Sequence, residues 1–317
     1  MGRNACHKLG IIKKIDEVRS LESNPDYVKK SHPKLVKGLG CIPGEYNIEL
    51  KDDATPYNLT TPRRIPIPLL ERVEIEIKRM EDLDVIERVD QPTDWCSPVV
   101  VVPKKNGAVR ICGDFIQLNK AVKRENHPMP TTEQTLAKLA GAKIVSKLDA
   151  NSGFWQRKLS DQSKHLTTFI TPWGRYCYKR LPFGISSAPE HFQKIMQRIL
   201  VGLEGVECQM DDSLVFGECH KQHDTRLEAV LSRVEENGIT LNPEKCEFSA
   251  EKVEFLGHRI GKDGIEVDPS KVEAVQQMKA PSDVPELRRF LGKANQMGKY
   301  LPNLAQTSKP LRDLLSK

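Results

Sequence analysis

Two adjacent aspartates, Asp211 and Asp212, lie at a turn between two predicted strands over 206–210 and 214–216. A third aspartate, Asp149, ends another predicted strand. If these strands are neighbours in one sheet, the three carboxylates meet at one edge of it. Converging carboxylates repel one another and stay ionised mainly when hard cations such as Mg²⁺ neutralise them. The pattern predicts a metal site, although an aspartate pair in a turn is by itself a common structural feature.

Positive charge is concentrated in one part of the sequence. Residues 98–180 contain 15 Lys or Arg and 5 Asp or Glu, whereas the whole chain of 317 residues has a net charge of only +6. Such a concentration is typical of a surface that binds phosphate groups. Taken alone, it is equally compatible with a solvated lysine-rich surface.

The sequence shows the features of an intracellular protein without a membrane partner. The first residues lack the basic start and apolar stretch of a secretory signal, and no run approaches the roughly 18 apolar residues that a membrane span needs. The eight cysteines form no CxxC pair, so we expect free thiols in a reducing compartment. Cys219, His220 and His223 are interpreted as a solvated helix start rather than a metal site, because they do not make a closed set of ligands.

Helix and strand patterns alternate without the regular spacing of a doubly wound sheet, so the predicted fold class is α+β. Apolar residues at every third or fourth position predict a helix over 69–86. Two β-branched runs on either side of Asn106-Gly107 predict a hairpin with a basic tip. Capping boxes predict helix starts at Thr131 and Ser187. Further predicted elements are helices over 192–203 and 227–234, strands over 253–260 and 265–267, and two helices after Pro269.

Four short motifs occur in a fixed order along the chain. They are SKLDANSGFWQ at 146–156, LPFGISSAP at 181–189, MDDSLVF at 210–216 and FLGH at 255–258. In this order and at these separations, the motifs resemble the reverse transcriptase of gypsy-type LTR retrotransposons. The similarity runs from about Gly44 to the C-terminus and includes the segment VRIC at 109–112.

The resemblance implies a right-hand polymerase fold with fingers, palm and thumb, built on an antiparallel palm sheet. It implies a nucleotidyltransferase, an RNA-directed DNA polymerase, that adds dNTPs to a primer on an RNA or DNA template by two-metal phosphoryl transfer. It assigns catalysis and the binding of two Mg²⁺ or Mn²⁺ ions to Asp149, Asp211 and Asp212. The residues that it assigns to the incoming nucleotide are Lys104, Lys105, Arg110, Ala150, Phe154 and Phe183. Those that it assigns to the primer are Gln209, Met210, Phe255, Leu256, Gly257 and His258.

Two of these assignments also have a physical rationale. Phe154, five positions after Asp149, matches the ring that acts as a steric gate against the ribose 2′-hydroxyl; taken alone, it would be read as a core aromatic. Arg110 suits a triphosphate because a guanidinium binds phosphate oxygens through paired donors, whereas a lysine supplies a point charge. A surface position on a strand is the alternative for Arg110.

The resemblance also implies an origin in a longer polyprotein. Residues 4–10 resemble the last helix of a preceding protease domain, so 1–40 is expected to be the tail of that domain and a linker. Residues 41–265 are expected to form the fingers and palm, and 266–317 the thumb and the start of the connection. A ribonuclease H domain is expected to follow Lys317. Ribonuclease H activity is therefore expected of the full polyprotein. The expected location is the cytoplasm, a virus-like particle or the nucleus.

Several positions depart from the family pattern. Gln209 stands where the family usually has Tyr or another ring, and Ser213 replaces an aliphatic residue after the aspartate pair. Gly113 and Arg157 also occupy positions where an aliphatic side chain is expected. These departures leave one alternative open, a catalytically decayed relic that still binds nucleic acid.

Overall fold

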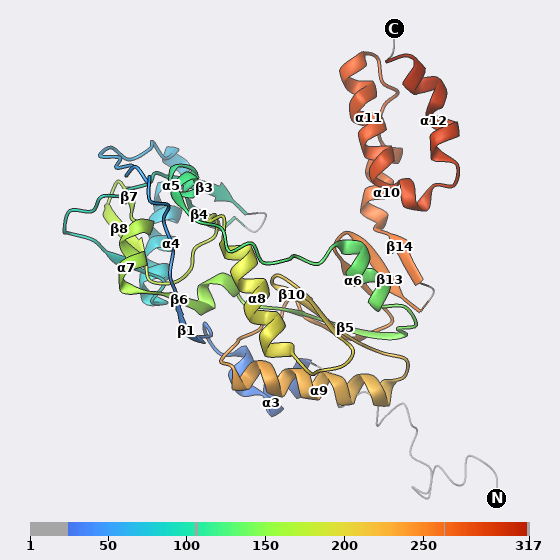
Figure 1. Cartoon of the computed structure of the whole chain (residues 1–317), viewed down its shortest axis with the longest axis horizontal. Coiled ribbons are helices and arrows are strands. Elements are labelled where there is room, and N and C mark those ends of the chain that lie inside the picture. The colour runs from blue at the N-terminus through green and yellow to red at the C-terminus, as the bar shows by residue number, and fades with distance from the viewer. Residues whose placement is uncertain (1–24, 105–106, 263, 316–317) are drawn as a thin grey trace, which may run out of the picture.

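The computed structural model describes residues 25–104, 107–262 and 264–315. The predicted α+β class is confirmed, since helices are mixed with small and mostly antiparallel sheets. Figure 1 shows a body formed by α4, α5 and the strands around them, a central sheet beside α8 and α9, and a group of C-terminal helices that projects away. None of the helices within the described residues is long and apolar enough to cross a membrane.

The first body contains the predicted hairpin and the predicted amphipathic helix. Strands β3 (Val99–Pro103) and β4 (Val109–Gly113) pair in antiparallel fashion, and α4 (Leu70–Asp82) packs against β4. The helix buries Val73 and Ile77, one turn apart on the same side. The other elements here are α5 (Ile116–Ala121), α7 (Asp161–Lys164), the parallel pair β1 (Ile42–Tyr46) and β6 (Arg157–Leu159), and the antiparallel sheet of β2 (Ile86–Arg88), β8 (Gly174–Tyr178) and β7 (Phe169–Thr171).

The central sheet has four strands in the order β11-β5-β10-β9, and all neighbours are antiparallel. Its members are β5 (Ile144–Asp149), β9 (Val206–Gln209), β10 (Asp212–Gly217) and β11 (Glu247–Ala250). The expected antiparallel sheet is therefore present, and β5 lies directly beside β10.

Side chains alternate along β5 and β10, which gives the central sheet two different faces. On one face Leu148 and Val215 join the main core, where α8 (Ala188–Leu200) and α9 (His220–Glu236) pack. On the other face Val145 and Leu214 join a second core with α6 (Thr132–Lys138) and the strands after residue 251. Asp149 and Asp212 share this second face, because each lies an even number of residues from its apolar neighbour on the strand.

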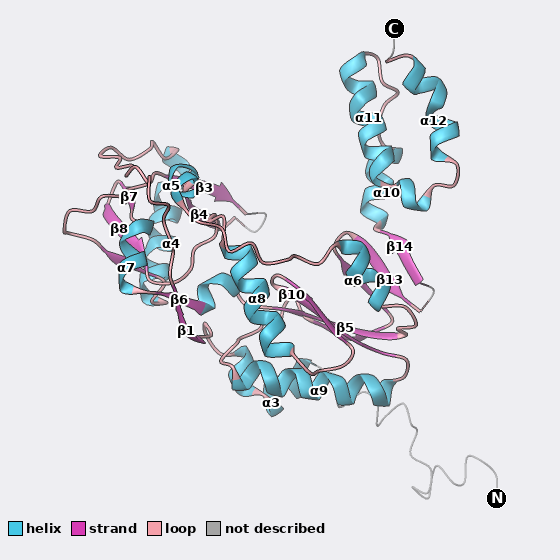
Figure 2. Ribbon diagram, viewed as in Figure 1, coloured by secondary structure: helices cyan, strands magenta, loops and turns pink. Residues whose placement is uncertain are grey.

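The C-terminal part begins with a three-stranded antiparallel sheet of β12 (Lys252–Phe255), β13 (His258–Gly261) and β14 (Gly264–Val267). The helices α10 (Pro269–Gln276), α11 (Val284–Gln296) and α12 (Leu304–Asp313) follow (Figure 2). Two hydrogen bonds join the C-terminal helical part to the β12–β13 hairpin. The Lys271 ammonium donates to the Gly257 carbonyl at 3.0 Å, and Tyr300 forms a hydrogen bond with His258.

The structure corrects three of the predicted elements. The strand predicted over 253–260 is interrupted by a two-residue turn, in which Leu256 and Gly257 have φ of +51° and +74°, a backbone typical of tight hairpins. Three helices, rather than two, follow Pro269. The helix predicted over 69–86 ends at Asp82, and Ile86 begins the strand β2. The described residues before 40 include the helix α3 (Pro25–Ser31).

The capping box at Thr131 is confirmed, but the second one, at Ser187, is wrong. Ser187 does precede α8, yet its hydroxyl makes no capping bond. Instead it lies 2.6 Å from the Tyr46 hydroxyl, and Glu190 pairs with Arg124 at 2.5 Å. Both side chains are therefore used for tertiary contacts, which sequence spacing does not reveal.

Candidate active site

The pairing of β5 with β10 brings the three predicted aspartates together. Asp149 is the last residue of β5, Asp212 is the first of β10, and the two are register partners. Partners of this kind project on the same face with β-carbons about 5 Å apart. Asp211 lies in the turn between β9 and β10, where its carbonyl accepts a hydrogen bond of 2.9 Å from the Ala150 amide.

A two-residue turn, Met210-Asp211, presents the aspartates. Met210 has φ of +55°, the sign that the first central position of a tight hairpin turn needs and that a side chain disfavours. Gln193, fully buried on α8, secures this turn from one side. Its side-chain amide donates to the Cys208 carbonyl at 2.9 Å, and its carbonyl oxygen accepts from the Met210 amide at 2.7 Å. Gln193 is a site residue that the sequence analysis missed.

Burial and neighbouring charges raise the pKa values of Asp211 and Asp212. The pKa of Asp211 is raised to about 6, first by burial and then by the charges of Asp149 and Asp212. Burial also raises the pKa of Asp212, while the Lys147 ammonium opposes the shift. Such shifts are typical of carboxylates that share a site and need a positive partner.

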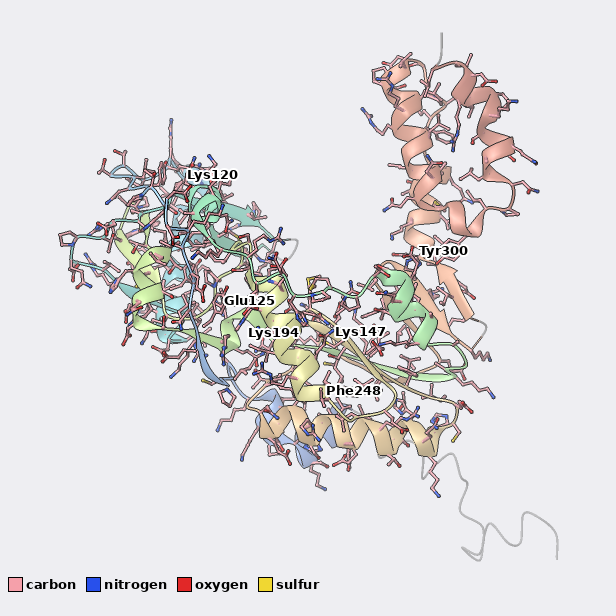
Figure 3. The ribbon with its side chains drawn as sticks, in the orientation of Figure 1. Lys120, Glu125, Lys147, Lys194, Phe248 and Tyr300 are labelled. Carbon is pink, nitrogen blue, oxygen red and sulfur yellow. The ribbon has the colours of Figure 1, made fainter. Side chains whose placement is uncertain are left out.

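Two lysines supply positive charge beside the carboxylates. Lys147, labelled in Figure 3, places its ammonium 3.7 Å from Asp212 Oδ1 and donates to the Glu254 carbonyl at 3.1 Å. Lys245 reaches Asp149 from a later segment, with Nζ at 3.1 Å from Oδ2 and 3.2 Å from Oδ1. Neither lysine was predicted from the sequence to be part of the site.

The donor set fits a hard divalent cation. Asp211 Oδ1 is buried without a hydrogen-bond partner, and carboxylate oxygens are the ligands that Mg²⁺ prefers. Gly153 leaves room beside it, because a β-carbon there would collide with Asp211 Oδ1 and lie 2.9 Å from Phe192 Cζ. No three His, Cys, Asp or Glu side chains among the described residues are already arranged around an ion position.

Three of the residues predicted to contact the nucleotide form one cluster. Phe154 packs against Phe183 with ring centroids 4.9 Å apart, and the Arg110 guanidinium lies over the Phe183 ring at 5.7 Å. Phe192, which adjoins the Gly153 position, contacts Phe154 at 5.5 Å and so connects this cluster to the aspartates. Ala150 is buried beside Asp149.

Of the two lysines predicted at the tip of the β3–β4 hairpin, Lys104 lies within the described residues. Lys104 is exposed at the end of β3, where its amide and carbonyl bond to Ala108 and Gly107. Lys105 lies outside the described residues.

The residues predicted to contact the primer are placed in two groups. Gln209 and Met210 adjoin the aspartates; Met210 is 36% exposed, and Gln209 Oε1 is buried without a partner. Phe255 is only 1% exposed and packs in the second core, so its side chain is structural rather than available to a primer. Leu256 and Gly257, in the β12–β13 turn, and His258, the first residue of β13, are partly exposed, and their role stays a prediction.

The segment with Cys219, His220 and His223 is not a solvated helix start throughout. His223 is fully buried. Its ring lies 2.9 Å from Ser146 Oγ through Nε2 and 2.8 Å from Asp224 Oδ1 through Nδ1. The interpretation was wrong for this residue, because it tethers α9 to β5 behind the aspartates.

The sequence around these aspartates matches a known protein family. The sequence model of the family described as "Reverse transcriptase (RNA-dependent DNA polymerase)" matches residues 102–260, and this range includes all three aspartates. The chain belongs to the reverse transcriptase family. The boundaries of the match run from within β3 to within β13, so the reverse transcriptase region covers the central sheet and part of the first body.

Relatives with longer chains share most of this reverse transcriptase. This chain is 33% identical over 286 residues to "Uncharacterized protein K02A2.6" of Caenorhabditis elegans. The matched residues cover 89% of this chain and 22% of the relative. It is 34% identical over 289 residues to "Transposon Tf2-3 polyprotein" of Schizosaccharomyces pombe. That match covers 90% of this chain and 21% of the relative. The chain thus spans about a fifth of the length of these curated relatives. It is a reverse transcriptase domain of the kind found within retrotransposon polyproteins.

Solved structures of foamy viral protease-reverse transcriptase share the fold. One, with dsDNA, has a TM-score of 0.83 at 21% identity, covering 100% of this chain and 63% of that chain. Another, the dRH form with dsDNA, has a TM-score of 0.82 at 23% identity. It covers 91% of this chain and 51% of that chain. The right-hand polymerase fold that the resemblance implied is therefore confirmed.

Proposed function

We propose that this reverse transcriptase domain is an active RNA-directed DNA polymerase that extends a primer with dNTPs. The observation that carries the proposal is the Asp211 carboxylate, whose Oδ1 is buried without a hydrogen-bond partner and whose pKa is raised by burial and by the charges of Asp149 and Asp212. A surface that binds only nucleic acid has no need for three mutually repelling aspartates. Phosphoryl transfer does, because it depends on metal ions.

The chemistry is divided among the residues of the site. Bound Mg²⁺ or Mn²⁺ ions, held by Asp149, Asp211 and Asp212, would activate the primer hydroxyl and neutralise charge on the leaving pyrophosphate. Arg110 would hold the phosphates of the dNTP, and its contact with Phe183 fixes the direction of the guanidinium. Phe154, packed between Phe183 and Phe192, presents a rigid ring against which the sugar is selected.

The assignment extends to the whole chain. We assign 41–265 to fingers and palm, 266–317 to thumb and the start of the connection, and 1–40 to the tail of a protease domain and a linker. We place the domain in the polyprotein of a gypsy-type LTR retrotransposon, acting in the cytoplasm, a virus-like particle or the nucleus. The complexes of foamy viral protease-reverse transcriptase with dsDNA and with RNA/DNA hybrid support a primer–template as the partner.

A decayed relic that only binds nucleic acid is the second candidate, and Gln209 favours it. This residue replaces the usual ring, pairs with Asp212 across the hairpin and buries an unpartnered oxygen. Primer extension separates the two candidates. The chain is incubated with an RNA template, a DNA primer and dNTPs in Mg²⁺ or Mn²⁺, with EDTA as the control. Metal-dependent lengthening of the primer supports the polymerase; retained template binding without lengthening supports the relic.

A further inference from the structure

The Lys245 ammonium occupies a position at Asp149 that suits a bound cation. It lies almost equally far from both carboxylate oxygens, at 3.1 and 3.2 Å, rather than on one of them. The side chain of Asp149 is only 12% exposed, whereas that of Lys245 is 63% exposed. The positive group is therefore on the solvent side of the pair and is free to leave.

Backbone contacts hold the Lys245 segment against Asp149. The Asn242 amide donates to the Asp149 carbonyl at 2.9 Å, and the Lys245 amide donates to the Asn242 carbonyl at 3.1 Å. The Asp149 amide in turn donates to Cys246 Sγ at 3.4 Å. The turn over 242–246 is thus fixed to the end of β5, while the flexible stem of Lys245 spans the remaining distance to the carboxylate.

Lys147 differs from Lys245 in each of these respects. Its side chain is 20% exposed, it lies 3.7 Å from Asp212, and it also donates to the Glu254 carbonyl. Lys147 is therefore fixed to the wall of the site, whereas Lys245 closes the site from outside.

We propose that Lys245 is a positioning residue that serves as an internal counter-ion for Asp149 and is displaced when a divalent metal ion binds. This inference rests on the proposed metal site. A compact ammonium on a four-carbon stem suits such an exchange, since it neutralises the carboxylate without coordinating it. Lys245 then occupies the place beside Asp149 that a metal ion needs, and it sets how tightly the site binds that metal.

Titration of the metal-free protein with Mn²⁺, followed by the electron paramagnetic resonance signal of the free ion, tests the proposal without any activity measurement. Lys245→Met keeps the stem and removes the charge, so we expect Mn²⁺ to bind about two- to fivefold more tightly, the range typical of a solvent-exposed ion pair. Lys245→Arg keeps the charge and is expected to bind like the wild type. Lys143→Met, at the opposite end of β5, removes the same net charge and is expected to change nothing.

The outcomes are distinct. Unchanged or weaker Mn²⁺ binding by Lys245→Met overturns the proposal, as does equal tightening in Lys143→Met, which would indicate a general charge effect. Asp149→Asn separates this inference from the proposed function. If Asp149→Asn binds Mn²⁺ like the wild type, the metal site itself is wrong; if it loses binding while Lys245→Met is unchanged, only the role of Lys245 fails.

Discussion

Asp149 and Asp212 stand opposite each other across the antiparallel pair β5–β10, as the last residue of one strand and the first of the other. Like charges directly opposite on a sheet are unfavourable. The structure offsets this with one lysine beside each, Lys245 at Asp149 and Lys147 at Asp212, but leaves Asp211 Oδ1 unpartnered. The site therefore keeps an excess of negative charge, which a bound metal ion would neutralise.

The raised pKa of Asp211 makes the stability of the metal-free protein depend on pH. Its folded pKa of about 6 exceeds the unfolded value of about 3.9, so the unfolded chain binds fewer protons between these values. Stability should consequently fall as pH rises from about 4 to about 6 and stay lower above that range. Asp211→Asn should be more stable than the metal-free wild type at pH 8, by on the order of 1–2 kcal/mol, and similar to it at pH 4. Urea unfolding at both pH values measures this; equal stability at pH 8 would contradict it.

Gln193 should affect catalysis through the shape of the aspartate turn. Gln193→Leu leaves the Cys208 carbonyl and the Met210 amide without their partner, which should cost about 1–3 kcal/mol of unfolding free energy. We expect the extension rate to fall further than template affinity, because a turn displaced by about 1 Å misplaces the reacting groups. Gln197→Leu, exposed on the same helix, is the control and should change stability by less than about 0.5 kcal/mol. If Gln193→Leu and Gln197→Leu change stability and extension rate equally, Gln193 has no specific role in shaping the turn.

Phe154 should govern the choice between deoxyribose and ribose. Its ring is held between Phe183 and Phe192, so Phe154→Val opens space at a fixed place in the cluster. Incorporation of ribonucleotides should rise relative to dNTPs, whereas Phe154→Tyr, which keeps the ring, should retain discrimination. The ratio of the two incorporation efficiencies is the measurement, and an unchanged ratio in Phe154→Val would refute the assignment.

Substitution of Gln209 tests whether the chain is a decayed relic. It lies opposite Asp212 in the hairpin, and its buried amide oxygen has no partner. Gln209→Tyr should raise the extension rate more than it changes template affinity, because a ring there can pack against the terminal nucleotide. Equal rates at saturating primer–template and dNTP would show that Gln209 is a neutral variant.

Local chemistry in the sequence was sufficient to predict the aspartate edge. One strand-forming run ends on Asp149 and another follows the turn at Asp211, and alternation of side chains along each run determines which face each residue occupies. The hairpin over 99–113 is marked by Asn-Gly at its turn. The Leu256-Gly257 turn escaped prediction because leucine rarely adopts positive φ.

Partners that are distant in sequence could not be predicted. Lys245 meets Asp149 across 96 positions, and Gln193 lies within a helical stripe whose pattern indicates only packing. Ser187 illustrates the opposite case, because its local capping signal is overridden by Tyr46, 141 positions away. Motif spacing thus identified the carboxylates, whereas the groups that position them required the folded chain.

The rate of single-nucleotide addition by Asp149→Asn, measured beside its affinity for primer–template, tests the account most directly. Asparagine keeps the size of the side chain and removes the charge that a metal requires, so the rate should fall by on the order of 1000-fold or more. Affinity should change little, because it is spread over many phosphate contacts. A rate near that of the wild type, or an affinity that falls in step with the rate, would contradict a catalytic role for the aspartates at this edge.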